Sequence, residues 1–266
     1  MGAGIQAILS GATKEEAVWQ AYIAWSADLL IEGKKGKNKD IWNAIYAIEK
    51  YEAIAHMTKV KDYELAFFTD ADGKEVPAIE LSFRITFPDG YSYIGFVDAV
   101  LKHKQSGELL VLELKTNGSY NVDEAQYKNS GQALGYSIIL DAITSQYKDE
   151  TLADYHVLYL VYKTTDRELE QFIFEKTYTQ RALWIQELLF DVEILKMYEA
   201  ANIYPMHGQS CYDFMRNCEY FGVCTVATER LVKPISQKEV DAEAAARYTV
   251  DLTVGEVIDA LLSNAM

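Results

Sequence analysis

Two short apolar segments that carry carboxylates constrain the fold of this chain more than any other feature. Residues 93–100 read Tyr-Ile-Gly-Phe-Val-Asp-Ala-Val, and residues 109–115 read Leu-Leu-Val-Leu-Glu-Leu-Lys. The intervening Lys-Gln-Ser-Gly-Glu is a turn signal, so the pattern predicts two adjacent strands of a hairpin. Both faces of these strands are otherwise apolar, which is typical of strands covered on both sides.

Charged side chains interrupt the apolar segments at Asp98, Glu113 and Lys115. A charge is costly to bury unless it is paired or bound to an ion. Two carboxylates on adjacent strands repel each other, and oxygen ligands of this kind suit Mg²⁺ or Mn²⁺. Lys115 shares a strand face with Glu113, where it could orient or deprotonate a metal-bound water. The structural alternative is a buried network of charges that only joins two strands.

A helix is predicted after the hairpin, from Asp123, a good N-cap residue, to about residue 143. Asn129, Gln132 and Tyr136 are spaced by three and four residues, so they form one polar stripe on this helix. A polar stripe beside a strand that carries carboxylates suits a phosphate backbone. The alternative is a stripe that faces only solvent.

Three motifs therefore follow one another along the chain: Gly95-x-x-Asp98, Glu113-x-Lys115 and Gln132-x-x-x-Tyr136. In combination they resemble the PD-(D/E)XK nuclease superfamily, and in particular its RecB-like branch of phage exonucleases and CRISPR adaptation nucleases. The resemblance covers roughly residues 40–225. It implies that Asp98 and Glu113 hold a metal ion, helped by the main-chain carbonyl of Leu114. It also implies that Lys115 positions or activates the attacking water, and that Gln132 and Tyr136 contact DNA.

The resemblance implies a mixed α/β fold with an αβββαβ core and extra helices at both ends. The patterns predict helices at residues 13–32, 40–57, 123–143 and 178–201, and strands at 63–69, 78–87, 91–102, 108–116, 155–163 and 169–176. One nuclease domain is expected over residues 1–225, with a helical part at 1–60, the core at 61–176, and a packing helix with a cysteine segment at 177–225. Residues 226–266 would form an extension whose short helix, starting near Thr253, either docks on the domain or binds a partner.

Further acidic residues lie outside the three motifs. In the superfamily a first acidic residue comes from a helix before the strands, which makes Glu49 the candidate here and His56 an alternative. A surface glutamate paired with a lysine is the structural alternative for Glu49. Strand 78–87 is expected to place Ile79, Leu81, Phe83, Ile85 and Phe87 on one face, with Glu80 and Arg84 on the other. Glu80 and Arg84 could pair with each other or support the site from behind its ligands, and a structural role is favoured.

A cysteine segment follows the core. His207 and Cys211 are followed by Cys218 and Cys224, with six and then five residues between successive cysteines. Three interpretations remain open: a Zn²⁺ site of three cysteines and His207, an iron–sulfur cluster with a fourth ligand from elsewhere, or ordinary buried cysteines. Related RecB-like nucleases bind such a cluster with one additional cysteine near the N-terminus, and this chain has no cysteine before Cys211.

The bulk properties narrow the class of protein. A formal net charge of −15 counts against nonspecific binding of polyanions, although residues 33–39 or 102–104 could form a local basic groove. The absence of a long apolar run and of a basic N-terminal leader, with three clustered cysteines, favours an intracellular, cytoplasmic protein, in the host cytoplasm if it is encoded by a phage.

The expected function is a Mg²⁺- or Mn²⁺-dependent deoxyribonuclease, specifically an exonuclease of phage-type recombination or replication, with DNA as its partner. Two alternatives stay open at this point. One is a DNA-binding or assembly subunit that keeps the fold without catalysis. The other is a processing or adaptation nuclease that works with a protein partner or as a homo-oligomer.

Overall fold

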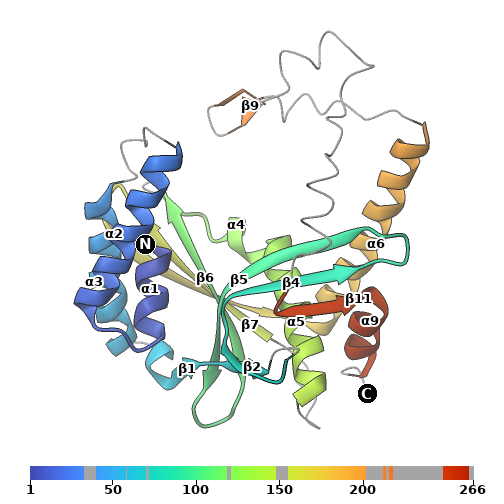
Figure 1. Ribbon diagram of the computed structural model, residues 1–266, viewed down its shortest axis with the longest axis horizontal. Helices are drawn as coiled ribbons and strands as arrows, with labels where there is room; N and C mark the ends of the chain where they lie inside the picture. Colours follow the sequence, from blue (N-terminus) through green and yellow to red (C-terminus); the bar gives the residue numbers. More distant parts are fainter. Residues whose placement is uncertain are drawn as a thin grey trace. The chain divides into compact units, whose positions relative to one another are not determined.

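The computed structural model describes residues 1–32, 40–57, 59–69, 72–118, 121–147, 155–201, 212–213, 216–217 and 248–263 (Figure 1). The chain forms two compact units, one of Met1–Ile185 with Tyr248–Met266 and the other of Gln186–Arg247. The second unit includes the hairpin of β9 (Tyr212–Asp213) and β10 (Arg216–Asn217). The first unit holds the central sheet and the sequence motifs.

The central sheet is mixed, with strand order β11-β4-β5-β6-β7-β8. Its strands are β4 (Ile79–Thr86), β5 (Ser92–His103), β6 (Leu109–Asn117), β7 (Tyr155–Lys163), β8 (Glu168–Lys176) and β11 (Val250–Thr253). The pairs β4–β5, β5–β6 and β7–β8 are antiparallel, whereas β6–β7 and β11–β4 are parallel. The parallel step from β6 to β7 is where a helix must cross over the sheet.

Helices of the first unit cover both faces of this sheet (Figure 1). The helices of the described residues are α1 (Gly2–Leu9), α2 (Lys14–Glu32), α3 (Ile41–Met57), α4 (Ala125–Lys128), α5 (Gly131–Tyr147), α6 (Tyr178–Ala201), which continues into the second unit, and α9 (Val254–Ser263), with the 3₁₀ turn η1 (Lys59–Asp62). On one face Ile5 of α1 and Tyr51 of α3 pack with Leu112 and Leu160 of the sheet. On the other face α5 crosses between β6 and β7.

Local sequence explains where several helices begin. The Thr13 hydroxyl accepts a hydrogen bond from the Glu16 N–H, while the Glu16 carboxylate accepts one from the Thr13 N–H, which together form a capping box. The same exchange joins Thr253 and Glu256 at the start of α9. Asp40 caps α3 by accepting from the N–H of Asn43. Each cap satisfies amide groups that the first helical turn leaves without partners.

The predicted fold class, a mixed α/β sheet with helices on both sides, is confirmed. Two element predictions were wrong in detail. The segment 63–69 is two strands, since β1 (Tyr63–Leu65) pairs with β5 while β2 (Phe67–Thr69) pairs with β3 (Glu75–Pro77). The helix predicted for 123–143 is broken between α4 and α5, so Asn129 lies in the break as the C-cap of α4. The helix α1 was not predicted.

The C-terminal helix docks on the first unit, which was one of the two predicted alternatives. It follows β11, which extends the sheet, and α9 packs beside α5 and β4. Arg84 of β4 donates from Nε to Oδ1 of Asp251 in β11 at 3.0 Å. A domain boundary at residue 225 stays a prediction, because residues 218–247 lie outside the described part.

The long helix α6 matches its predicted bounds, and its role as a packing helix stays a prediction. Leu183 is 54% exposed, whereas Ile185 is 5% exposed and the ring centroid of Trp184 lies 5.2 Å from that of Tyr93 in β5. Among the described residues, no helix combines the length and the apolar character that crossing a membrane would need.

A buried ion pair gives the first unit a testable weak point. Arg181 Nε lies 2.7 Å from Asp141 Oδ2, and both side chains are fully buried, which joins the start of α6 to α5. Replacing Arg181 with Met leaves a buried carboxylate without this partner, so we expect the free energy of unfolding to fall by about 3–5 kcal/mol. Chemical denaturation measures this loss.

The matched controls separate the ion pair from general damage. Lys50→Met breaks the exposed pair with Glu168 and should cost about 0–1 kcal/mol. The double variant Arg181→Met/Asp141→Leu should recover most of the stability, because no buried charge is left alone. A double variant as unstable as the single variant would contradict this account.

Candidate active site

The candidate site lies where β5 and β6 separate. The two strands pair from Lys102↔Leu109 to Ala99↔Leu112, and the regular register ends there. Asp98 takes the place of the next backbone partner, because its Oδ2 accepts a hydrogen bond of 2.7 Å from the N–H of Leu114. The carboxylate is thereby held against the strand that carries Glu113. In an extended strand the carbonyl of Leu114 points the same way as its N–H, toward Asp98.

A chain of polar contacts runs from Glu113 to α5. Lys115 Nζ lies 2.6 Å from Glu113 Oε1 and donates a hydrogen bond of 2.9 Å to Gln132 Oε1. Gln132 Nε2 in turn donates to the Tyr136 hydroxyl at 2.5 Å. Strand alternation explains the first contact, and the four-residue spacing on α5 explains the last. The structure therefore brings together four of the residues that the sequence singled out.

The electrostatic environment disfavours two ionised carboxylates. Burial, and after it the negative charge of Asp98, raises the pKa of Glu113 to about 7 in spite of Lys115. Burial also raises the pKa of Asp98, while the hydrogen bond from the Leu114 N–H opposes this effect. Glu113 is 3% exposed, and its Oε2 is a buried atom without a hydrogen-bond partner. An unpartnered buried oxygen next to a second carboxylate is what a cation would satisfy.

Glu80 adds a third carboxylate; the sequence favours a structural role for it, with a place next to the site as the alternative. In the β4–β5 register Ile79 pairs with Ala99 and Leu81 with Val97, so Glu80 lies across from Asp98. Its negative charge contributes to the raised pKa of Asp98. Gln6 of α1 holds Glu80 by donating from Nε2 to Oε1 at 2.6 Å. Sequence patterns could not reveal this position, because they do not determine the register between strands.

The expected alternation of β4 was wrong at the same place. Ile79 packs with the α1–α3 side of the core, whereas the ring of Phe83 meets Tyr136 of α5 on the opposite face at a centroid distance of 6.1 Å. Glu80 lies between them with a φ of 47°, which is uncommon for a residue other than glycine. This irregularity redirects the strand beside Asp98, as backbone strain at functional sites often does.

Gly95 of the Gly-x-x-Asp motif has a packing role. A Cβ atom at this position would come within 2.5 Å of the Phe83 ring. The glycine thus lets the Phe83 ring lie flat over β5, next to Tyr136.

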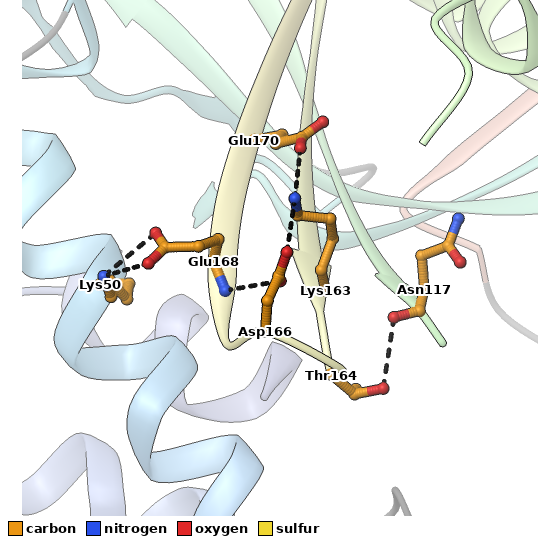
Figure 2. A network of polar contacts seen from close by, with 7 residues as sticks. All are labelled: Lys50, Asn117, Lys163, Thr164, Asp166, Glu168 and Glu170. Atoms are coloured by element: carbon orange, nitrogen blue, oxygen red, sulfur yellow. Dashed lines mark hydrogen bonds and ion pairs between the residues drawn. The ribbon is translucent and has the colours of Figure 1, made fainter. Parts of the chain in front are cut away.

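A pocket of about 600 Å³ opens beside these carboxylates. Asp98, Glu80 and Leu114 line one part of it, and Trp25 of α2 and Tyr162 of β7 line other parts. Asn117 and Thr164 also line it, and the Asn117 carbonyl accepts from the Thr164 hydroxyl at 3.3 Å (Figure 2). This wall is therefore tied to the turn between β7 and β8.

That turn is itself braced by charged side chains. Lys163 Nζ lies 2.8 Å from Asp166 Oδ2 and 2.6 Å from Glu170 Oε1, and Lys50 of α3 reaches Glu168 at 3.1 Å (Figure 2). The Lys163 contacts lie within the β7–β8 hairpin, and the exposed Lys50–Glu168 pair connects this hairpin with α3.

Other predicted site residues lie elsewhere. Glu49 pairs with Lys14 at 3.5 Å and lines a separate pocket with Lys50 and Arg167, so the structure does not bring it to Asp98. Asn129 is exposed in the break before α5. The possible metal ligands Cys211, Cys218, Cys224 and His207 lie outside the described residues, as does the basic segment 33–39.

The residues of the site fit a divalent cation through mixed ligands. In the described ranges no three His, Cys, Asp or Glu side chains group together as a metal site. Asp98 and Glu113 could nevertheless contribute carboxylate oxygens and Leu114 a carbonyl, which are the hard ligands that Mg²⁺ accepts while keeping waters. The unpartnered Oε2 of Glu113 supports this fit.

The family comparison is consistent with this geometry. The family model described as the PD-(D/E)XK nuclease superfamily matches residues 10–225. No curated protein matches the chain by sequence.

The raised pKa of Glu113 predicts a pH-dependent stability in the absence of divalent cations. Between its ordinary pKa of 4.5 and its folded pKa of about 7, the folded state binds more protons than the unfolded state. The free energy of unfolding should therefore fall as pH rises through this range, by on the order of 1–3 kcal/mol. Denaturation in EDTA from pH 4.5 to pH 8 measures the fall.

Glu113→Gln should flatten this dependence, since the amide does not titrate. Glu49→Gln, on an exposed carboxylate outside the site, should keep the wild-type slope. Adding Mg²⁺ at pH 8 should stabilise the wild type more than Glu113→Gln. Equal slopes for the wild type and Glu113→Gln would contradict the environment described for Glu113.

Proposed function

Because the chain belongs to the PD-(D/E)XK nuclease superfamily, we propose that it is a deoxyribonuclease that hydrolyses phosphodiester bonds with Mg²⁺ or Mn²⁺. We place it in the RecB-like branch, as an exonuclease of phage-type recombination or replication. The observation that carries the proposal is the continuous set of contacts from Asp98 through Leu114, Glu113 and Lys115 to Gln132. Buried charges in this arrangement are costly for a fold that does not use them.

Asp98, Glu113 and the carbonyl of Leu114 would hold the cation between β5 and β6. The cation would supply positive charge at the scissile phosphate and would acidify the attacking water. Burial keeps bulk water away from this point and strengthens each charge interaction. The strands set the positions of the ligands before substrate arrives, because Asp98 is already anchored to the Leu114 N–H.

Lys115 would orient the attacking water. Its ammonium is held between Glu113 Oε1 and Gln132 Oε1, so it reaches the site in one position. Tyr136 helps to fix the Gln132 amide, because its hydroxyl accepts a hydrogen bond from Gln132 Nε2. The amide oxygen Oε1 then points toward Lys115. Tyr136 is 5% exposed, so we assign it to positioning, whereas the exposed Gln132 remains the residue proposed to contact DNA.

Substitutions at the site test the proposal directly. We expect Asp98→Asn, Glu113→Gln and Lys115→Met each to lower the rate of Mg²⁺-dependent cleavage by at least about 100-fold, because each removes a ligand or the group that orients the water. Cleavage of labelled DNA, with EDTA as the metal-free control, gives the rates.

Glu49→Gln is the matched control and should cut within about twofold of the wild type, because Glu49 pairs with Lys14 outside the site. Circular dichroism establishes that each variant is folded. Full cleavage by all three site variants, or no cleavage by the wild type with either Mg²⁺ or Mn²⁺, would overturn the proposal and favour a non-catalytic DNA-binding subunit.

Exonucleolytic action has its own test. An exonuclease needs an end, so linear DNA labelled at its ends should be degraded, whereas covalently closed circles of the same sequence should persist. Gel analysis of both substrates in one reaction compares them. Cutting of the closed circles at a similar rate would show an endonuclease.

A further inference from the structure

An aromatic series on α2 leads toward the candidate site. The rings of Trp19 and Tyr22 are stacked at a centroid distance of 5.6 Å, and those of Tyr22 and Trp25 are 6.1 Å apart. Trp19 is 59% exposed and Tyr22 43% exposed. Trp25 lines the pocket that also contains Asp98. The three rings, which we call the α2 ladder, thus extend from the surface to the pocket that the carboxylates also line.

The α2 ladder is not needed to pack the helix. Small residues on another side of α2, Ala17 and Ala21, are buried against Ile48 of α3. Trp19 and Tyr22 therefore lie outward, as an exposed aromatic pair of the kind that often marks a binding site, whereas Trp25 is half-buried beside the pocket. Aromatic side chains in such a series are a common platform for the bases of single-stranded nucleic acids.

The pocket at the end of the ladder has the wrong charge for a phosphate. Its lining includes Asp40, Glu80 and Asp98, and no lysine or arginine occurs among the described residues that line it. A neutral, flat group is better suited to this space. Its volume of about 600 Å³ lies within the range of small-ligand sites, and its carboxylate and amide oxygens can accept hydrogen bonds from N–H groups on the edge of a base.

We propose that the α2 ladder and this pocket bind the unpaired bases of a single DNA strand, with one base beside Trp25 and the adjoining phosphate at the cation that Asp98 and Glu113 would hold. The inference rests on the proposed nuclease function and names its substrate class. A base within a duplex is stacked and paired, so it cannot enter without being unpaired first. Stacking would also supply affinity that a chain of net charge −15 cannot draw from its overall charge.

The test measures binding of nuclease-resistant phosphorothioate DNA by fluorescence anisotropy in Mg²⁺. Three probes carry equal numbers of phosphates: oligothymidine, an abasic oligonucleotide and a blunt hairpin duplex. The wild type should bind oligothymidine at least about 5-fold more tightly than the other two. Trp19→Ala should weaken oligothymidine binding about 5-fold or more, which corresponds to one stacked base, and should leave abasic binding unchanged.

Phe67→Ala is the matched control, since Phe67 is 53% exposed on β2 and lies outside the α2 ladder; it should leave binding of all three probes unchanged. Trp19 is exposed enough for its replacement to leave the fold intact, and Trp25→Leu provides a second variant that acts at the pocket. If the wild type cleaves DNA but Trp19→Ala binds oligothymidine as tightly as the wild type does, the proposed binding of bases by the α2 ladder is wrong and the nuclease proposal stands. If binding depends on the bases and requires Trp19 but the wild type does not cleave DNA, the nuclease proposal is wrong and the binding of bases by the α2 ladder is supported.

Discussion

The hydrogen bond from the Leu114 N–H to the carboxylate of Asp98 is the contact on which the candidate site depends. It replaces a backbone partner at the point where β5 leaves β6. An amide at this position would otherwise lack a partner within the sheet, so the side chain and the backbone satisfy each other. Burial raises the pKa of Glu113, and the Asp98 charge, which this contact holds near Glu113, adds to the effect. The contact therefore couples the geometry of the sheet to the electrostatics of the site.

The surrounding fold compensates for the free-energy cost of holding these carboxylates close together. Three carboxylates, those of Asp98, Glu113 and Glu80, act on one another, and the single ammonium of Lys115 opposes them. The backbone of Glu80 is strained, and the residues before and after it, Ile79 and Leu81, keep their antiparallel pairing with β5. The apolar core under α1 and α3 and the docked β11–α9 segment give the sheet the rigidity that such a site requires. A strained backbone conformation of this kind persists only where the surrounding structure fixes it in place.

Much of the site could be predicted from the chain because it is local in sequence. Glu113 and Lys115 share a strand face by alternation, and Gln132 and Tyr136 share a helix face by their spacing. Predictions that depended on distant contacts were less successful. Glu49 matched a motif by order along the chain, yet α3 directs it to Lys14. The break before α5 removed Asn129 from the predicted stripe, because helix propensity does not reveal where a helix must end to reach the sheet.

The sequence by itself determined the superfamily, the strands of the core and the chemical groups at its centre, since these follow from short periodic patterns and ordered motifs. Only the tertiary structure decided that Glu80 lies across from Asp98, that the C-terminal segment completes the sheet beside β4, and that Trp25 shares a pocket with the carboxylates. Strand register and helix docking join residues far apart in the chain, and they are selected by the packing of the whole core. Periodicity contains no information about that choice.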